Sequence, residues 1–86
     1  MNKRDFVKSQ IHIKLTPGKM LRILRELQEL SQEDLASLTN MTQSNISALE
    51  TGSRQIGRER ALVLAKALKV HPAVILFPDF DISKVA

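Results

Sequence analysis

The sequence of 86 residues contains no cysteine. This absence excludes a disulfide framework and any metal site built from thiolates, and it is compatible with a reducing cytoplasm. Histidine is also scarce: His12 and His71 are too far apart in the sequence to have the spacing of metal ligands. His71 precedes Pro72 and is better explained as a residue at the start of a helix. We therefore expect neither a metal nor a cofactor.

Long hydrophobic runs are absent as well. No apolar stretch approaches the ~20 residues that a membrane-spanning helix needs. The first residues are polar and basic and lack the apolar core of a secretion signal. We expect a protein that stays in the cytoplasm and does not enter a membrane.

The arrangements of side chains that enzymes use are also missing. Ser44 and Ser47 have no histidine near them in the sequence, and no glycine-rich loop could hold a phosphate group. Glu33 and Asp34 fall in the first turn of a predicted helix, where acidic side chains favour the helix dipole. We therefore expect that the protein is not an enzyme.

The charge that is present is mainly positive. The formal net charge is +4 and the isoelectric point is about 9.9. Basic residues gather before residue 26, where Asp5 is the only acid: they are Lys3, Arg4, Lys8, Lys14, Lys19, Arg22 and Arg25. A basic chain of one-domain length favours a polyanionic partner.

The most informative stretch is SQEDLASLTNMTQSNISALETG, residues 31–52. Ser31 can cap a helix, and Asp34 three residues later can complete a capping box. Thr39–Asn40 ends this helix, since Asn tolerates the left-handed conformation. Thr42 caps a second helix, which Gly52 ends. The spacing predicts two short helices joined by a tight turn. Their inward-facing residues are predicted to be Leu35, Ala36, Leu38, Ile46 and Leu49.

The outer face of the second helix is uncharged before Glu50. It consists of Gln43, Ser44, Asn45, Ser47 and Ala48. Amide side chains can pair with adenine, hydroxyls can bond to several bases, and an alanine methyl can contact thymine in the major groove. The alternative is an ordinary solvated face in a helix bundle. The order of helix, tight turn and polar-faced helix favours a helix-turn-helix.

Three further helices are predicted around this pair. The first begins at Thr16-Pro17, since proline suits the first turn. Its inward residues are predicted to be Met20, Leu21, Ile23, Leu24, Leu27 and Leu30, with Lys19, Arg22, Arg25, Glu26 and Glu29 in solvent. Another helix covers 58–68, with Ala61, Leu62, Leu64, Ala65 and Leu68 inward. The last covers 73–77 and ends before Pro78.

The flanking segments leave alternatives open. Ile11, Ile13 and Leu15 alternate with polar residues, which favours a short strand; a flexible arm, or a basic arm that reaches the DNA backbone, would also fit. The apolar residues from Phe77 to Val85 either cover the core or form a dimer seam. We favour the seam, because a single small helix-turn-helix binds one half-site weakly.

Residues 19–77 resemble the Cro/cI-like (XRE) helix-turn-helix family. The resemblance is carried by LRELQELSQEDLASLTNMTQSNISALETG, including the Ser-Gln cap, Leu-Ala, and the Glu-x-Gly closure at Glu50 and Gly52. It departs from the family at Asn40–Met41 and at Ile56–Gly57. The family implies an all-α, five-helix, lambda-repressor-like domain. We expect this domain at 16–78, between an N-terminal arm or strand at 1–15 and a tail at 79–86.

The resemblance also implies a site. Gln32 and Gln43 match positions that hold a phosphate and an adenine in phage repressors. Ser44 and Ser47 would read bases, with Asn45 and Ala48 at the margin. Arg54 would contact a phosphate from the loop after the second helix, and Lys19 and Arg22 are candidate backbone contacts. The implied partner is double-stranded DNA with a palindromic operator, bound by a homodimer.

A narrower resemblance concerns IHIKLTPGKMLRILRELQELSQ, TQSNISALE and AKALKVHPAVILFPDFD, which look like the HigA-like antitoxins. That group combines an XRE domain with neutralisation of a HigB/RelE-like ribonuclease toxin, and its members repress their own promoters. The alternative is a stand-alone phage-type repressor without a toxin partner.

Overall fold

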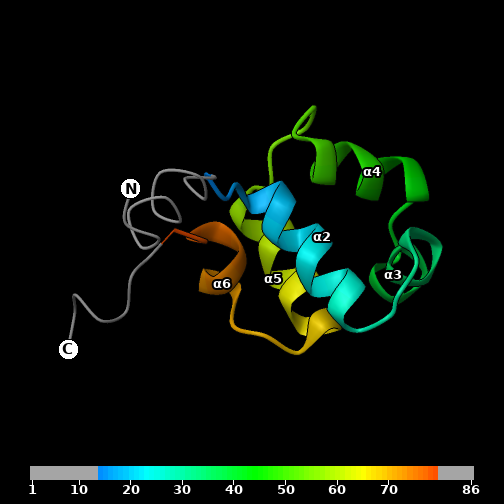
Figure 1. Cartoon of the computed structure of the whole chain (residues 1–86). Coiled ribbons are helices and arrows are strands. Elements are labelled where there is room, and N and C mark those ends of the chain that lie inside the picture. Colours follow the sequence, from blue (N-terminus) through cyan, green and yellow to red (C-terminus); the bar gives the residue numbers. More distant parts are fainter. Residues whose placement is uncertain (1–13, 80–86) are drawn as a thin grey trace, which may run out of the picture.

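The computed structural model describes residues 14–79, which contain five helices and no strand (Figure 1). They are α2 (Pro17–Leu27), α3 (Gln32–Thr39), α4 (Gln43–Thr51), α5 (Arg58–Leu68) and α6 (Pro72–Leu76). The predicted five-helix, all-α architecture is confirmed. Of the proposed strand at 11–15, Lys14 and Leu15 have no regular secondary structure, and the rest lies outside the described residues.

The helix caps predicted from the sequence are present in the structure. Ser31 and Asp34 form a reciprocal capping box, with 2.9 Å from Asp34 N to Ser31 Oγ and 2.8 Å from Ser31 N to Asp34 Oδ2. Thr42 accepts from Asn45 N at 3.1 Å. Asn40 (φ 59°) ends α3 and Gly52 (φ 86°) ends α4, both in the left-handed conformation. These caps fix where the two central helices begin and end.

The core lies between all five helices. In Figure 1, α2 crosses the molecule between α4 and α6, and α5 packs against α6 and α3. Ile46 and Leu49 of α4 are buried against this core, so the opposite side of α4 remains at the surface. The buried apolar side chains are Leu21, Leu35, Ala36, Ile46, Leu49, Ala61, Leu64, Ala65, Leu68 and Ile75.

Several predicted core positions were wrong. Leu27, Leu38 and Leu62 are 75%, 60% and 53% exposed, and Ile23 is also exposed. In α2, α3 and α5 the buried residues cover a narrower face than the apolar stripe of the sequence. Leu62, for example, is turned by about 100° from its buried neighbour Ala61. Arg25, predicted in solvent, lies instead on the buried face of α2.

Candidate nucleic-acid interface

The outer face of α4 is open to solvent. Gln43 and Ser44 are exposed, and Asn45, Ser47 and Ala48 are half-buried. Together with Gln32 of α3, part of this face lines a shallow hollow whose lining residues, all among those described, include no carboxylate: Gln32, Gln43, Ser44, Ser47, Ala48, Thr51 and Ser53. The hollow therefore brings together four predicted contact residues of α4 and the one predicted at the start of α3, whereas Asn45 lies beside it on α4.

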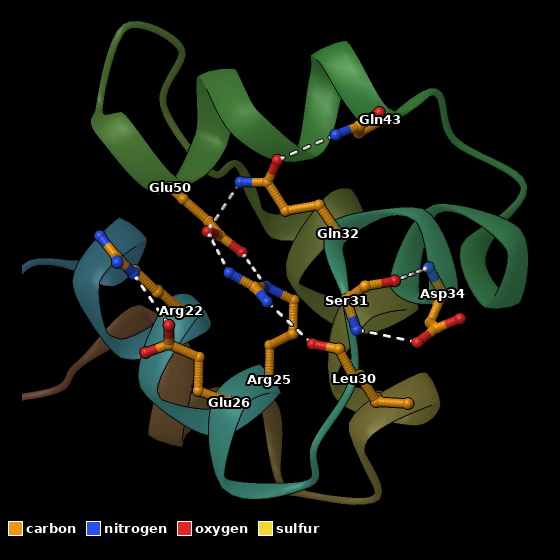
Figure 2. Close-up of polar contacts among 9 residues, drawn as sticks. All are labelled: Arg22, Arg25, Glu26, Leu30, Ser31, Gln32, Asp34, Gln43 and Glu50. Carbon is orange, nitrogen blue, oxygen red and sulfur yellow. Dashed lines mark hydrogen bonds and ion pairs between the residues drawn. The ribbon is translucent and has the colours of Figure 1, made fainter.

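A buried ion pair lies beneath this face. Arg25 of α2 donates from Nε to Glu50 Oε2 at 2.6 Å and from Nη2 to Glu50 Oε1 at 3.0 Å (Figure 2). Its third donor, Nη1, reaches Leu30 O at 2.8 Å in the α2–α3 connection. Arg25 and Glu50 are each 8% exposed. The hydrogen bonds to Glu50 raise the pKa of Arg25 above its ordinary value, so the guanidinium stays charged.

The ion pair continues into a chain of amide side chains. Gln32 donates from Nε2 to Glu50 Oε1 at 3.1 Å, and Gln43 donates from Nε2 to Gln32 Oε1 at 3.4 Å (Figure 2). The first residues of α3 and α4 are thus connected to the end of α4 and, through Glu50, to α2. Four helix positions far apart in the sequence form one polar network.

This network fixes the orientation of both amides. An ionised carboxylate only accepts, so Gln32 must turn its nitrogen toward Glu50 and its oxygen toward Gln43. Gln43 must then donate one N–H to Gln32. Within the described residues, its second N–H and its oxygen form no hydrogen bond, so both can bind another molecule. An acceptor beside a donor is the pattern that pairs with adenine N6 and N7.

The loop after α4 brings a cation to the same face. Arg54 N donates to Ala48 O at 3.1 Å, and Arg54 Nη1 donates to Asn45 Oδ1 at 3.3 Å. The exposed guanidinium therefore lies along the edge of α4 rather than away from it.

The remaining two predicted contacts differ in position. Lys19 lines a second hollow together with Thr51, Gly52, Arg54 and Gln55, so it shares a surface with the loop cation. Arg22 does not line this hollow and pairs with Glu26 on α2 at 3.3 Å, where both side chains are more than half exposed.

Sequence reasoning missed Arg25 as a supporting residue of this site. A usable signal was present: Arg25 follows Leu21 by four residues, and Leu21 lies on the inner face of α2. A cation on a buried face needs an acidic partner, and Glu50 is the one acid of α4. The pairing depends on the crossing of α2 and α4, which sequence spacing does not give.

The fold and the exposed polar helix together define a helix-turn-helix domain. Residues 21–75 match the helix-turn-helix family HTH_3, and the chain therefore belongs to this XRE-type family. It is 35% identical over 60 residues to an uncharacterized HTH-type transcriptional regulator, y4dL, of Sinorhizobium fredii. That match covers 70% of this chain but only 30% of the relative.

Solved structures show the same fold. The restriction-modification controller protein C.AhdI of Aeromonas hydrophila has 37% identity and a TM-score of 0.67, over 70% of this chain and 91% of that one. The P22 c2 repressor protein, solved in complex with synthetic operator 9T, has 25% identity and a TM-score of 0.70, over 74% and 97%. These relatives are regulators and not enzymes, in agreement with the expectation that this chain is not an enzyme.

The described part of the chain also lacks two kinds of feature. No helix within residues 14–79 is long and apolar enough to cross a membrane. The same residues contain no group of three metal-binding side chains.

Proposed function

We propose that this chain is a sequence-specific DNA-binding transcriptional repressor that acts in the cytoplasm as a two-fold dimer on a palindromic operator. One observation carries the proposal: α4 presents an uncharged, solvent-open face whose first side chain, Gln43, is held in one orientation by Gln32 and Glu50. Pre-oriented amides reduce the entropy lost when a base is bound. The P22 c2 repressor, solved with an operator, has the same fold.

In this proposal the residues have separate tasks. Gln43, Ser44 and Ser47 contact base edges, with Asn45 and Ala48 at the margin of the groove. Gln32 supports Gln43 and offers its main-chain N–H, at the start of α3, to a phosphate. Arg54 and Lys19 supply positive charge along the sugar-phosphate chain, and Arg22 lies farther along α2 as a weaker candidate.

The test begins with selection of an operator from a random pool of DNA duplexes by the full chain. Affinities of wild type and Gln43→Ala are then measured for every single-base variant of that operator. We expect Gln43→Ala to lose about 1–3 kcal/mol of discrimination at one base pair per half-site, the amount that a bidentate contact supplies. Gln55→Ala, an exposed loop glutamine, is the control that retains the preference. Failure of any sequence to be enriched would refute the proposal.

A second candidate function is that of an antitoxin that also represses its own promoter and binds a HigB/RelE-like ribonuclease. It is supported by the resemblance of three segments to HigA-like antitoxins and by the exposure of Phe77 beside the tail, which a DNA reader does not require. Purification from the native host tests it. A small basic ribonuclease encoded by a neighbouring gene should co-purify at a defined ratio; its absence would favour a stand-alone regulator of the phage-repressor type.

A further inference from the structure

The loop that follows α4 is attached to α4 itself. Gly52 turns the chain in the left-handed conformation, after which Ser53 Oγ and Arg54 N donate to Ala48 O at 3.3 and 3.1 Å. Thr51 Oγ1 donates to the same carbonyl at 3.3 Å. The main chain of Arg54 is therefore held against α4, and its side chain reaches Asn45 nine residues earlier.

The bond between Arg54 and Asn45 determines how the amide of Asn45 points. A guanidinium has donors and no acceptor, so the atom of Asn45 that faces it must be Oδ1, at 3.3 Å from Arg54 Nη1. The two hydrogens of Nδ2 then point away from Arg54. The main chain of Asn45 is fixed as well, because its N–H donates to Thr42 Oγ1 at 3.1 Å.

Asn45 and Gln43 are thus prepared for different partners. Gln43 offers an acceptor and a donor, because its contact with Gln32 uses one N–H. Asn45 turns Oδ1 toward Arg54, so the side of its amide that faces away from Arg54 offers the donors of Nδ2. Adenine needs both an acceptor and a donor, whereas guanine presents two adjacent acceptors, O6 and N7, in the major groove.

We propose that Asn45 reads a guanine in each operator half-site and that Arg54 positions Asn45 for this contact. The inference rests on the proposed function, since it assigns a base to one residue of the same interface. Arg54 then does more than supply charge to the DNA backbone: it is a positioning residue for sequence recognition. The guanine belongs to the edge of the half-site, because Asn45 lies at the flank of the exposed face of α4.

The experiment uses the operator selected with the full chain and compares wild type, Asn45→Ala, Arg54→Ala and the double variant on all single-base changes. Wild type should prefer guanine at one position per half-site by about tenfold. Asn45→Ala and Arg54→Ala should each reduce this preference to less than about twofold, and the double variant should lose no more than either single variant. Replacing that guanine by 7-deazaguanine should weaken wild type but not Asn45→Ala.

Arg58→Ala provides the matched control. Arg58 is an exposed arginine at the start of α5, and within residues 14–79 its side chain has no hydrogen bond to α4. Its removal should leave the guanine preference unchanged. Thermal unfolding by circular dichroism should show that all exposed-site variants fold as wild type does.

The possible failures are distinguishable. If Arg54→Ala weakens every sequence equally and keeps the preference that Asn45→Ala loses, Arg54 is a backbone contact only and the positioning role is wrong. If Asn45→Ala changes no base preference, or changes one at a base other than guanine, the assignment of Asn45 is wrong. In both cases the proposed function stands. If selection enriches no operator, the proposed function itself fails.

Discussion

At the scale of single residues, the Arg25–Glu50 pair connects the core to the exposed face of α4. Both charges are almost removed from water, and each is compensated mainly by the other. Such a pair contributes little to folding stability compared with an apolar replacement of both partners. Removal of one partner, however, leaves a buried charge without compensation. The pair also fixes Glu50 for Gln32, so its integrity affects the orientation of Gln43.

We predict that Arg25→Ala lowers the free energy of unfolding by about 3 kcal/mol, because Glu50 would remain buried and uncompensated. Urea unfolding followed by circular dichroism measures this change. Arg22→Ala, which removes an exposed i,i+4 ion pair from the same helix, is the control and should cost less than about 0.5 kcal/mol. Equal losses in the two variants would show that burial of Arg25 has no energetic importance.

Asp34 provides a prediction on pH. Its hydrogen bonds with the backbone and side chain of Ser31 lower the pKa of Asp34 from its ordinary value of 3.8. Because the folded-state pKa is the lower one, the stabilisation is fully present above pH 3.8 and is lost as pH falls through the folded-state pKa. The urea midpoint of wild type should therefore fall more steeply below pH 3.8 than that of Asp34→Asn. Parallel curves would contradict a role for the capping box.

At the scale of helices, the crossing of α2 over the end of α4 depends on Gly18. A Cβ at this position would lie 2.7 Å from Glu50 O and still closer to Leu49 O, both backbone atoms. These are the residues that precede Gly52 at the end of α4, where the loop with Arg54 begins. The close contact of the two helices therefore positions the carboxyl end of the exposed helix.

We predict that Gly18→Ala lowers the free energy of unfolding by about 1–3 kcal/mol, as overpacking does. The sign of this change in the free energy of unfolding is informative. Alanine is the better helix former by about 1 kcal/mol and would stabilise α2 if there were space for its Cβ. Gly57→Ala is the comparison: a Cβ at Gly57 meets nothing within 4 Å, and the change should stay within about 1 kcal/mol of wild type. Denaturant unfolding of both variants decides between these outcomes.

The helix boundaries could be predicted from the sequence because they depend on local contacts. Ser31 with Asp34, Thr42, Asn40 and Gly52 act within a few residues of their own positions, and all were found where predicted. The buried faces could be predicted only in part. Leu27 and Leu38 are as apolar as the true core residues, and only the placement of neighbouring helices leaves them in solvent.

The candidate site was predictable as a set of residues but not as a network. The pattern of uncharged side chains on α4 could be read from spacing, because one helix contains it. The connection from Arg25 through Glu50 and Gln32 to Gln43 joins three helices, and the bond from Arg54 to Asn45 requires the loop to turn back. The spacing from Leu21 indicates that Arg25 faces inward, but the partners of Arg25 and of Arg54 depend on how the helices and the loop pack. The DNA contacts of all these residues remain predictions.

At the scale of the whole molecule, the two ends of the described chain lie together. Leu15 N donates to Asp79 Oδ1 at 3.3 Å, and a groove beside them is lined mainly by apolar residues: Lys14, Leu15, Thr16, Pro17, Leu76, Phe77, Pro78 and Asp79. Phe77 is 62% exposed at this groove. Both flanking segments begin here, so this end of the molecule is the one at which we expect the dimer seam.

We predict that Phe77→Ser shifts the full chain from dimer toward monomer in sedimentation equilibrium and weakens binding to a two-half-site operator more than to a single half-site. The reason is that an exposed phenylalanine at a subunit interface contributes a large buried area. Leu27→Ser is the matched control, since Leu27 is even more exposed but lies at the other end of α2. If both variants remain dimeric, or if both dissociate, the seam does not lie at Phe77. In the first case the two half-sites, about 34 Å apart in such complexes, must be bridged by another surface of the chain.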